Sequence, residues 1–183
     1  VISGPGSALW GSNAVNGVIN ITTRSAKETG GALVKATAGK GPQGGVARYG
    51  FDLPGDGAFR VYAKATSQVS DALQSGAPAM DEWHAAQAGF RGDWGHSGNT
   101  LTVQGDAYKN TLASTPQGPG IADGGNLLGR WERALSPDSG FQIQVYGDRV
   151  LRKIPGLFAV RTDTLDVDVQ GHLSLGTRNA LVW

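Results

Sequence analysis

The sequence predicts an all-β membrane protein, an antiparallel transmembrane β-barrel of which about nine strands are present. Three observations lead to this prediction. Apolar and polar residues alternate with a period of two along most of the chain, which is typical of a sheet with two unlike faces. The 29 glycines among 183 residues mark the ends of the alternating segments, as turns between strands would. Most of the tight connections alternate with longer ones, as in outer-membrane barrels.

The alternation defines the strands. It is clearest at residues 57–69, where Phe59 and Val61 fall on one face and Arg60 and Lys64 on the other. A soluble β-sandwich would show the same alternation, so this pattern alone does not choose between the two folds. The predicted strands lie near residues 31–39, 45–53, 57–69, 83–94, 99–109, 125–135, 140–152, 161–175 and from 180 onward.

The connections favour the barrel. Tight turns are expected after the second, fourth, sixth and eighth strands, at residues 54–56, 95–98, 136–139 and 176–179. Longer loops are expected at 70–82, 110–124 and 153–160, whereas the first connection, 41–44, is short and breaks the rule. In outer-membrane barrels, short turns are periplasmic and long loops are extracellular.

Aromatic residues gather beside the expected tight turns. Phe51 and Phe59 flank the first turn, Phe90 and Trp94 precede the second, and Phe141 follows the third. Aromatic girdles at the two membrane–water interfaces would produce this pattern. The alternative is that these rings form the core of a soluble sandwich.

Composition narrows the function classes. The net charge of +1 gives no basic excess for nucleic acid, and the absence of cysteine excludes disulfides and thiolate metal sites. No stretch approaches the ~18 consecutive apolar residues of a membrane-spanning helix, and no signal peptide is recognisable. Both ends look cut, so we expect the sequence to be a fragment.

Residues 1–29 follow a different pattern. Gly4-Pro5-Gly6 predicts a turn that ends a strand, and Ser7 can cap a short helical turn at residues 8–10. Gly11 can end that turn, and residues 18–22 predict a buried strand.

This stretch resembles the C-terminal half of the plug domain of TonB-dependent receptors. That family has a Gly-Pro-x-Ser-x-Leu-Tyr-Gly turn, followed by an Ala-x-Gly-Gly-Val-Ile-Asn-Ile strand and Thr-Lys. This chain departs from the pattern at Ser3, where the family usually has Arg, at Trp10 for Tyr, and at Asn16 for Gly. The matching residues are Gly4, Pro5, Ser7, Leu9, Gly11, Ala14, Gly17, Val18, Ile19, Asn20, Ile21 and Thr22.

The resemblance implies both fold and function. Residues 1–29 would end an α+β plug domain, and residues 30–183 would begin a plugged barrel of about 22 strands. Such receptors carry out active transport across the bacterial outer membrane. A scarce nutrient binds at the extracellular face and is released when the plug moves. The implied partners are the TonB energy-coupling complex, outer-membrane lipid and a small-molecule nutrient, and no cofactor is implied.

The substrate stays open. A ferric siderophore is the first expectation because that class is large in the family, and cobalamin, haem and oligosaccharide are alternatives. A passive porin-like channel is the alternative mechanism, but it would lack the plug motif.

Polar residues of the alternating segments are the candidates for the barrel lumen, because a charged side chain on the lipid face is unfavourable. They would contact the plug or the substrate route, or simply line a solvated interior. These candidates are Arg48, Arg60, Lys64, Arg91, Asp106, Arg130, Glu132, Asp148, Asp166 and Asp168.

Loops 70–82 and 110–124 are the candidates for substrate selection. Asp81, Glu82 and His84 are metal-ligand types, but a polar loop explains them better, so no metal site is predicted. An enzyme is not expected, because the three histidines are scattered and neither a nucleophile elbow nor a P-loop is present.

Overall fold

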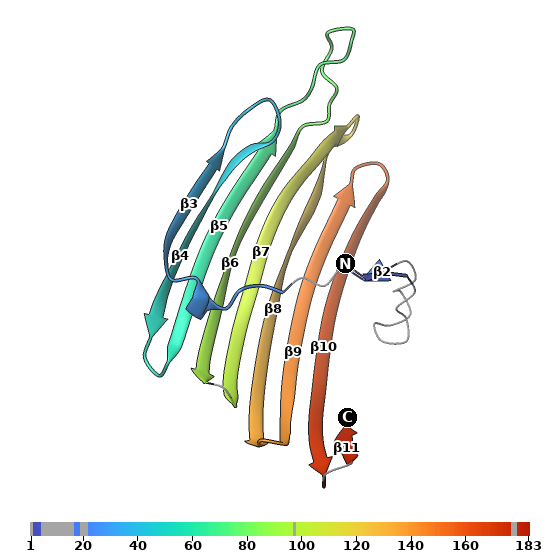
Figure 1. The fold of residues 1–183 in the computed structure, drawn as a ribbon. Coiled ribbons are helices and arrows are strands. Elements are labelled where there is room, and N and C mark those ends of the chain that lie inside the picture. The colour runs from blue at the N-terminus through green and yellow to red at the C-terminus, as the bar shows by residue number, and fades with distance from the viewer. Residues whose placement is uncertain (1, 5–16, 19–21, 97, 177–178) are drawn as a thin grey trace.

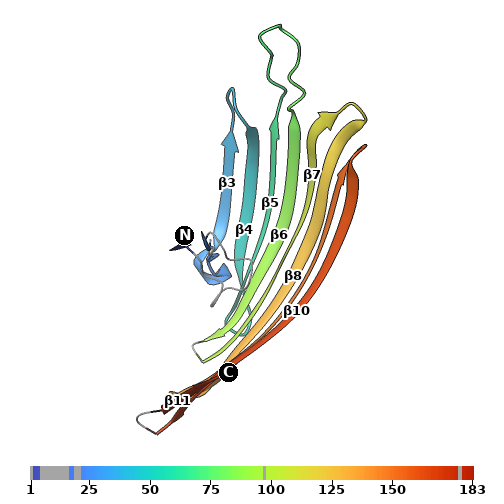
Figure 2. The same cartoon turned by 90° about the vertical axis from the view of Figure 1, so that its right-hand side faces the viewer.

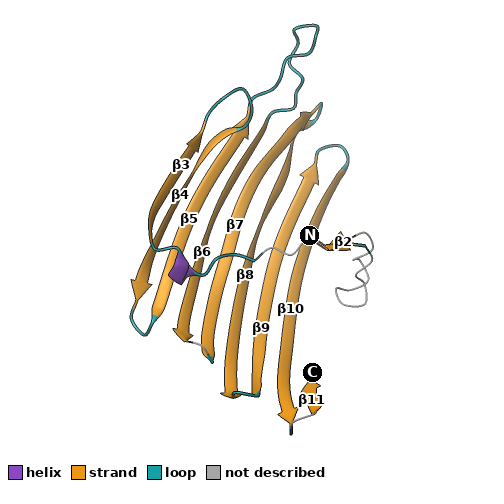
Figure 3. Ribbon diagram, viewed as in Figure 1, coloured by secondary structure: helices purple, strands orange, loops and turns teal. Residues whose placement is uncertain are grey.

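The computed structural model is dominated by one antiparallel sheet of nine strands, which follow one another in sequence order from β3 to β11 (Figure 1, Figure 3). The structure describes residues 2–4, 17–18, 22–96, 98–176 and 179–183. The strands of the sheet are β3 (Gly31–Thr37), β4 (Gln43–Leu53), β5 (Gly57–Gln68), β6 (Trp83–His96), β7 (Asn99–Thr115), β8 (Gly118–Ser136), β9 (Ser139–Ile154), β10 (Phe158–Leu175) and β11 (Asn179–Val182). The sheet is open, with β3 and β11 at its edges.

Three small elements precede the sheet. β1 (Ile2–Ser3) pairs antiparallel with β2 (Gly17–Val18), and η1 (Ala26–Glu28) is a single 3-10 turn. Of the motif residues, Pro5, Ser7, Leu9, Gly11, Ala14, Ile19, Asn20 and Ile21 lie outside the described residues, as does the expected helical turn at 8–10. The plug domain and its boundary at residue 29 therefore stay predictions. None of the described helical residues belongs to a helix long and apolar enough to span a membrane.

The predicted number of strands is confirmed, but two predicted loops are wrong. Residues 110–124 extend β7 and β8 into a long hairpin with its turn at residues 116–117. Residues 153–160 likewise hold only a turn at 155–157, where Gly156 has a φ of +78°. Glycine and proline in both segments resemble loop composition, yet backbone pairing continues through them because a ladder needs no particular side chain. The long connection that remains runs from residue 69 to 82.

The two faces of the sheet differ. Antiparallel partners place their side chains on the same face, so the register assigns every strand residue to one face. We call the face that η1 covers the inner face. It is the concave side of the curved sheet (Figure 2). The opposite, outer face carries exposed large apolar side chains on most of its strands, including Val34, Tyr49, Phe51, Val61, Leu101, Leu127, Trp131, Val145, Leu165, Val167 and Val169.

We call the end of the sheet with the turns at 54–56 and 137–138 the tight-turn end, and the end with loop 69–82 the long-loop end. Aromatic rings gather on the outer face toward the tight-turn end. Phe59 stands between Phe51 and Phe90, with centroid distances of 5.7 and 5.8 Å. Trp131 and Phe141 meet edge to face at 5.2 Å. Trp94, also on the outer face at this end, needs a small neighbour, because a Cβ on Gly92 would lie 2.4 Å from its ring.

The sheet has no second layer among the described residues. The buried apolar residues in that part of the chain are Ala26 of η1 and Ala58 of β5. The apolar side chains of the outer face are therefore left for another surface to cover.

Candidate functional site

Residues 22–30, which precede β3, lie across the inner face of the sheet (Figure 1). We call residues 22–30 the docked segment. Within it, Ser25 caps η1, and its backbone N–H donates to the Glu28 carboxylate at 3.1 Å. The Ser-x-x-Glu spacing of this capping box is visible in the sequence.

Asp93 of β6 is the centre of the docking contacts. From the docked segment, its Oδ2 accepts hydrogen bonds from the Ser25 hydroxyl at 3.1 Å and from the Ala26 backbone N–H at 2.6 Å. From the sheet, its carboxylate accepts two bonds from Arg91, at 2.8 and 2.9 Å, and one from the Thr102 hydroxyl at 2.7 Å. Asp93 is 7% exposed, so the carboxylate is satisfied almost entirely by protein.

Two arginines extend the contact. The Nη1 of Arg91 donates to the Thr23 hydroxyl at 2.7 Å. The Nη1 of Arg60 donates to the Arg24 carbonyl at 3.1 Å and to the Thr29 hydroxyl at 3.3 Å. Both ends of η1 are thus held by three side chains of the sheet, those of Arg60, Arg91 and Asp93.

A glycine lets the segment come close. A Cβ on Gly50 of β4 would lie 2.2 Å from the Thr29 carbonyl oxygen, so a side chain at this position cannot coexist with the docked segment. Thr29 is also buried, at 3% exposed.

Lys27 ties the segment to the tight-turn end of the sheet. Its ammonium contacts Asp56 at 2.9 Å, and Asp56 is also 2.9 Å from His96. The hydrogen bond from Lys27 lowers the pKa of Asp56 below its usual value, and His96 adds a smaller effect in the same direction.

All ten candidates for the lumen lie on the inner face. Of these, Arg60 and Arg91 contact the docked segment. The Tyr62 hydroxyl donates to Asp106, and Arg130 donates to Gln144 at 2.7 and 3.0 Å. The register places the whole set on this face: Arg48, Arg60, Lys64, Arg91, Asp106, Arg130, Glu132, Asp148, Asp166 and Asp168.

Two of these ten have a buried polar atom without a hydrogen bond, the Nε of Arg48 and an Oδ1 of Asp168. Sequence reasoning missed Asp93 itself, although its position two residues after Arg91 places both on one face.

The long loop folds back on itself. The Asp81 carboxylate accepts from the Asp71 backbone N–H at 2.9 Å and from the Ser70 hydroxyl at 3.2 Å. These bonds lower the pKa of Asp81, the Asp71 N–H having the larger effect. Within the described part of the chain, no group of three or more acidic or histidine side chains is arranged to hold a metal ion.

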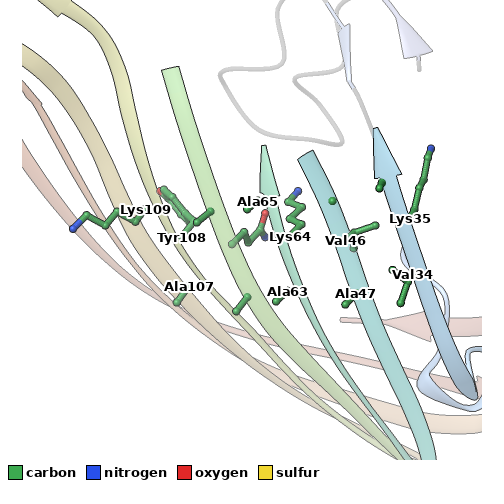
Figure 4. A pocket seen from close by; sticks show the side chains of 15 residues that line it. Val34, Lys35, Val46, Ala47, Ala63, Lys64, Ala65, Ala107, Tyr108 and Lys109 are labelled. Carbon is green, nitrogen blue, oxygen red and sulfur yellow. The ribbon is translucent and has the colours of Figure 1, made fainter. Parts of the chain in front are cut away.

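A shallow apolar trough of about 790 Å³ lies on the outer face. Its walls are two rows of mostly alanine side chains that face outward, one from Val34 to Ala107 and one from Ala36 to Lys109. The row between them, from Lys35 to Tyr108, points its side chains inward, so only its backbone forms the floor. In Figure 4, Ala47 and Ala63 leave their strands on the opposite side from Val46 and Lys64. The trough has almost no polar group, so it cannot orient a polar ligand.

Comparison with known proteins gives one short match. A stretch of 43 residues, 24% of this chain, is 49% identical to the vitamin B12 transporter BtuB of Vibrio vulnificus (strain CMCP6). The match spans 7% of the length of that protein. No protein-family model matches the chain, and no solved structure matches it significantly.

Proposed function

We propose that this chain belongs to a TonB-dependent receptor of the bacterial outer membrane, in which it forms the end of the plug and the first strands of the barrel. The receptor would carry out active uptake of a scarce nutrient, with energy from the TonB complex. The short match to a vitamin B12 transporter supports this assignment, and so does the nine-stranded antiparallel sheet.

One observation carries the proposal: the docked segment, residues 22–30, is fixed to the concave face of the sheet. The bonds at Asp93, Arg60 and Lys27 hold it there, on the face that carries the polar side chains. A plugged transporter requires such a segment in its interior, whereas an open channel does not.

The outer face supports a membrane location. On β8, the outward residues between Asp123 and Arg133 are uncharged. Ten residues at ~3.4 Å each, tilted by ~40°, span roughly 25 Å, the height of the apolar band of outer-membrane barrels. A soluble sandwich would need a second layer over this face, and the described residues contain none.

The substrate we propose is a scarce metal chelate. The sequence predicts a ferric siderophore first, but the short match is to a vitamin B12 transporter and gives no support for a siderophore. Cobalamin therefore stands beside a ferric siderophore as a candidate. Loop 69–82, the longest connection between the described strands of the sheet, is our candidate for contact with either ligand.

Uptake in cells tests the proposal. Strains that carry the full-length gene, with and without TonB, are compared for uptake of labelled cobalamin and labelled ferric siderophores. TonB-dependent uptake of one ligand supports the receptor and identifies its substrate. Uptake that does not depend on TonB would mean a passive channel and would reject the proposal.

A further inference from the structure

Most charged residues on the outer face of β7–β10 lie in two adjacent rows on the long-loop side of the apolar band. Lys153 lies one row further out, and Arg133 lies on the other side of the band. Across β7–β10 the register forms rows of paired residues that run from strand to strand. Three successive rows on the outer face, those that begin on β7 at Leu101, Val103 and Gly105, contain no charged residue. The next row toward the loop end contains Arg149 and Asp163, and the row beyond it contains Lys109, Asp123 and Arg161. Charge thus begins where the apolar band ends.

The centre of this group is a pair of arginines that share one carboxylate. The Nε of Arg149 donates to one oxygen of Asp163 at 2.5 Å, and the Nε of Arg161 donates to the other at 2.8 Å. Each arginine bonds Asp163 through its Nε. Both side chains are more than half exposed, at 63% and 55%.

One carboxylate balances only one of the two guanidinium charges. Lys109 and Asp123 of the same group balance each other, so the group of five keeps a net charge of +1. Two exposed, neighbouring arginine side chains are suited to bind a phosphate, because a guanidinium matches phosphate oxygens with parallel N–H donors.

We infer that Arg149 and Arg161, held together by Asp163, bind the headgroup phosphate of a membrane lipid in the leaflet at the long-loop end. This inference rests on the proposed membrane function, which sets the headgroups at this height. The uncharged rows directly below, including Leu165 and Leu127, would contact the acyl chains of the same lipid. Free phosphate lacks that apolar contact, so it would bind more weakly.

Lipid binding to the purified full-length protein tests the inference. The protein is refolded in detergent, and retention of lipid A is measured by native mass spectrometry, with a fully dephosphorylated lipid A as the neutral probe. The double variant Arg149→Gln/Arg161→Gln is expected to bind lipid A about 10-fold more weakly, the effect of losing two exposed charge contacts. Arg152→Gln, which removes the same charge from the inner face next to these residues, is the matched control and should bind like the wild type.

Three outcomes would overturn the inference: equal binding by the wild type and the double variant, equal retention of the phosphorylated and neutral lipids, or displacement by millimolar inorganic phosphate. Arg149→Lys/Arg161→Lys, which keeps the charge but not the paired donors, should show an intermediate loss and guards against misfolding of the glutamine variant. Binding requires no TonB, so its failure is separable from failure of the proposed transport.

Discussion

Removal of the Asp93 carboxylate should release the docked segment. Asp93→Ala deletes the acceptor for the Ser25 hydroxyl and for the Ala26 N–H. A hydrogen bond to a charged group contributes about 1.5–3 kcal/mol, so two of them at the lower limit amount to about 3 kcal/mol. Because 1.4 kcal/mol is a factor of ten, the open population of the docked segment should rise about 100-fold.

Hydrogen exchange measures this opening directly. The Ala26 N–H is protected by its bond to Asp93 and exchanges only when the segment leaves the sheet. In the full-length protein, mass spectrometry of a peptide that covers residues 22–30 should show an exchange rate about 100-fold higher in Asp93→Ala. Asp93→Asn, which keeps one acceptor oxygen, should show a smaller increase.

The control is Asp52→Ala. Asp52 is an exposed residue of β4 that lies on the inner face, as Asp93 does. The substitution changes the charge equally but leaves the Asp93 contacts intact, so exchange in residues 22–30 should match the wild type. If Asp93→Ala and Asp52→Ala exchange at the same rate, the docked segment is not held by Asp93 and the reasoning is refuted.

Three further predictions test the docking contact, the assignment of faces and the link to pH. Gly50→Ala would place its Cβ 2.2 Å from a backbone oxygen of the docked segment and should increase exchange there, whereas Gly129→Ala, with nothing within 4 Å, should not. Leu127→Arg puts a charge on the outer face and should cost about 2–4 kcal/mol of stability in the membrane, measured by urea unfolding in lipid vesicles; Asn126→Arg, one residue away on the inner face, should cost far less, and equal losses would mean the faces are misassigned. The pKa of Asp56 is lowered in the folded state, so its ion pair stabilises docking above the ordinary value of 3.8 and is lost as the pH falls below it. At pH values below about 4, protection of the docked segment, corrected for intrinsic exchange, should therefore decrease. Asp56→Asn should remove that part of the pH dependence.

The sequence alone determined the number of strands in the sheet and which residues of a strand share a face. A period of two is a local property, so Phe59 and Val61 had to share a face opposite Arg60 wherever the strand paired. The same reasoning placed the ten polar candidates together on one side. It failed at residues 110–124, because a strand rich in glycine has no side-chain pattern to reveal it, while backbone pairing forms regardless.

Only the tertiary structure decided what the inner face holds. Ser25 and Asp93 are 68 residues apart and meet because the chain turns back over β4, β5 and β6 before the sheet begins. Gly50 appears in the sequence as one of 29 glycines, and its role exists only because the Thr29 carbonyl lies against it. Periodicity follows from neighbours along the chain, whereas a buried carboxylate finds its donors from segments that only folding brings together.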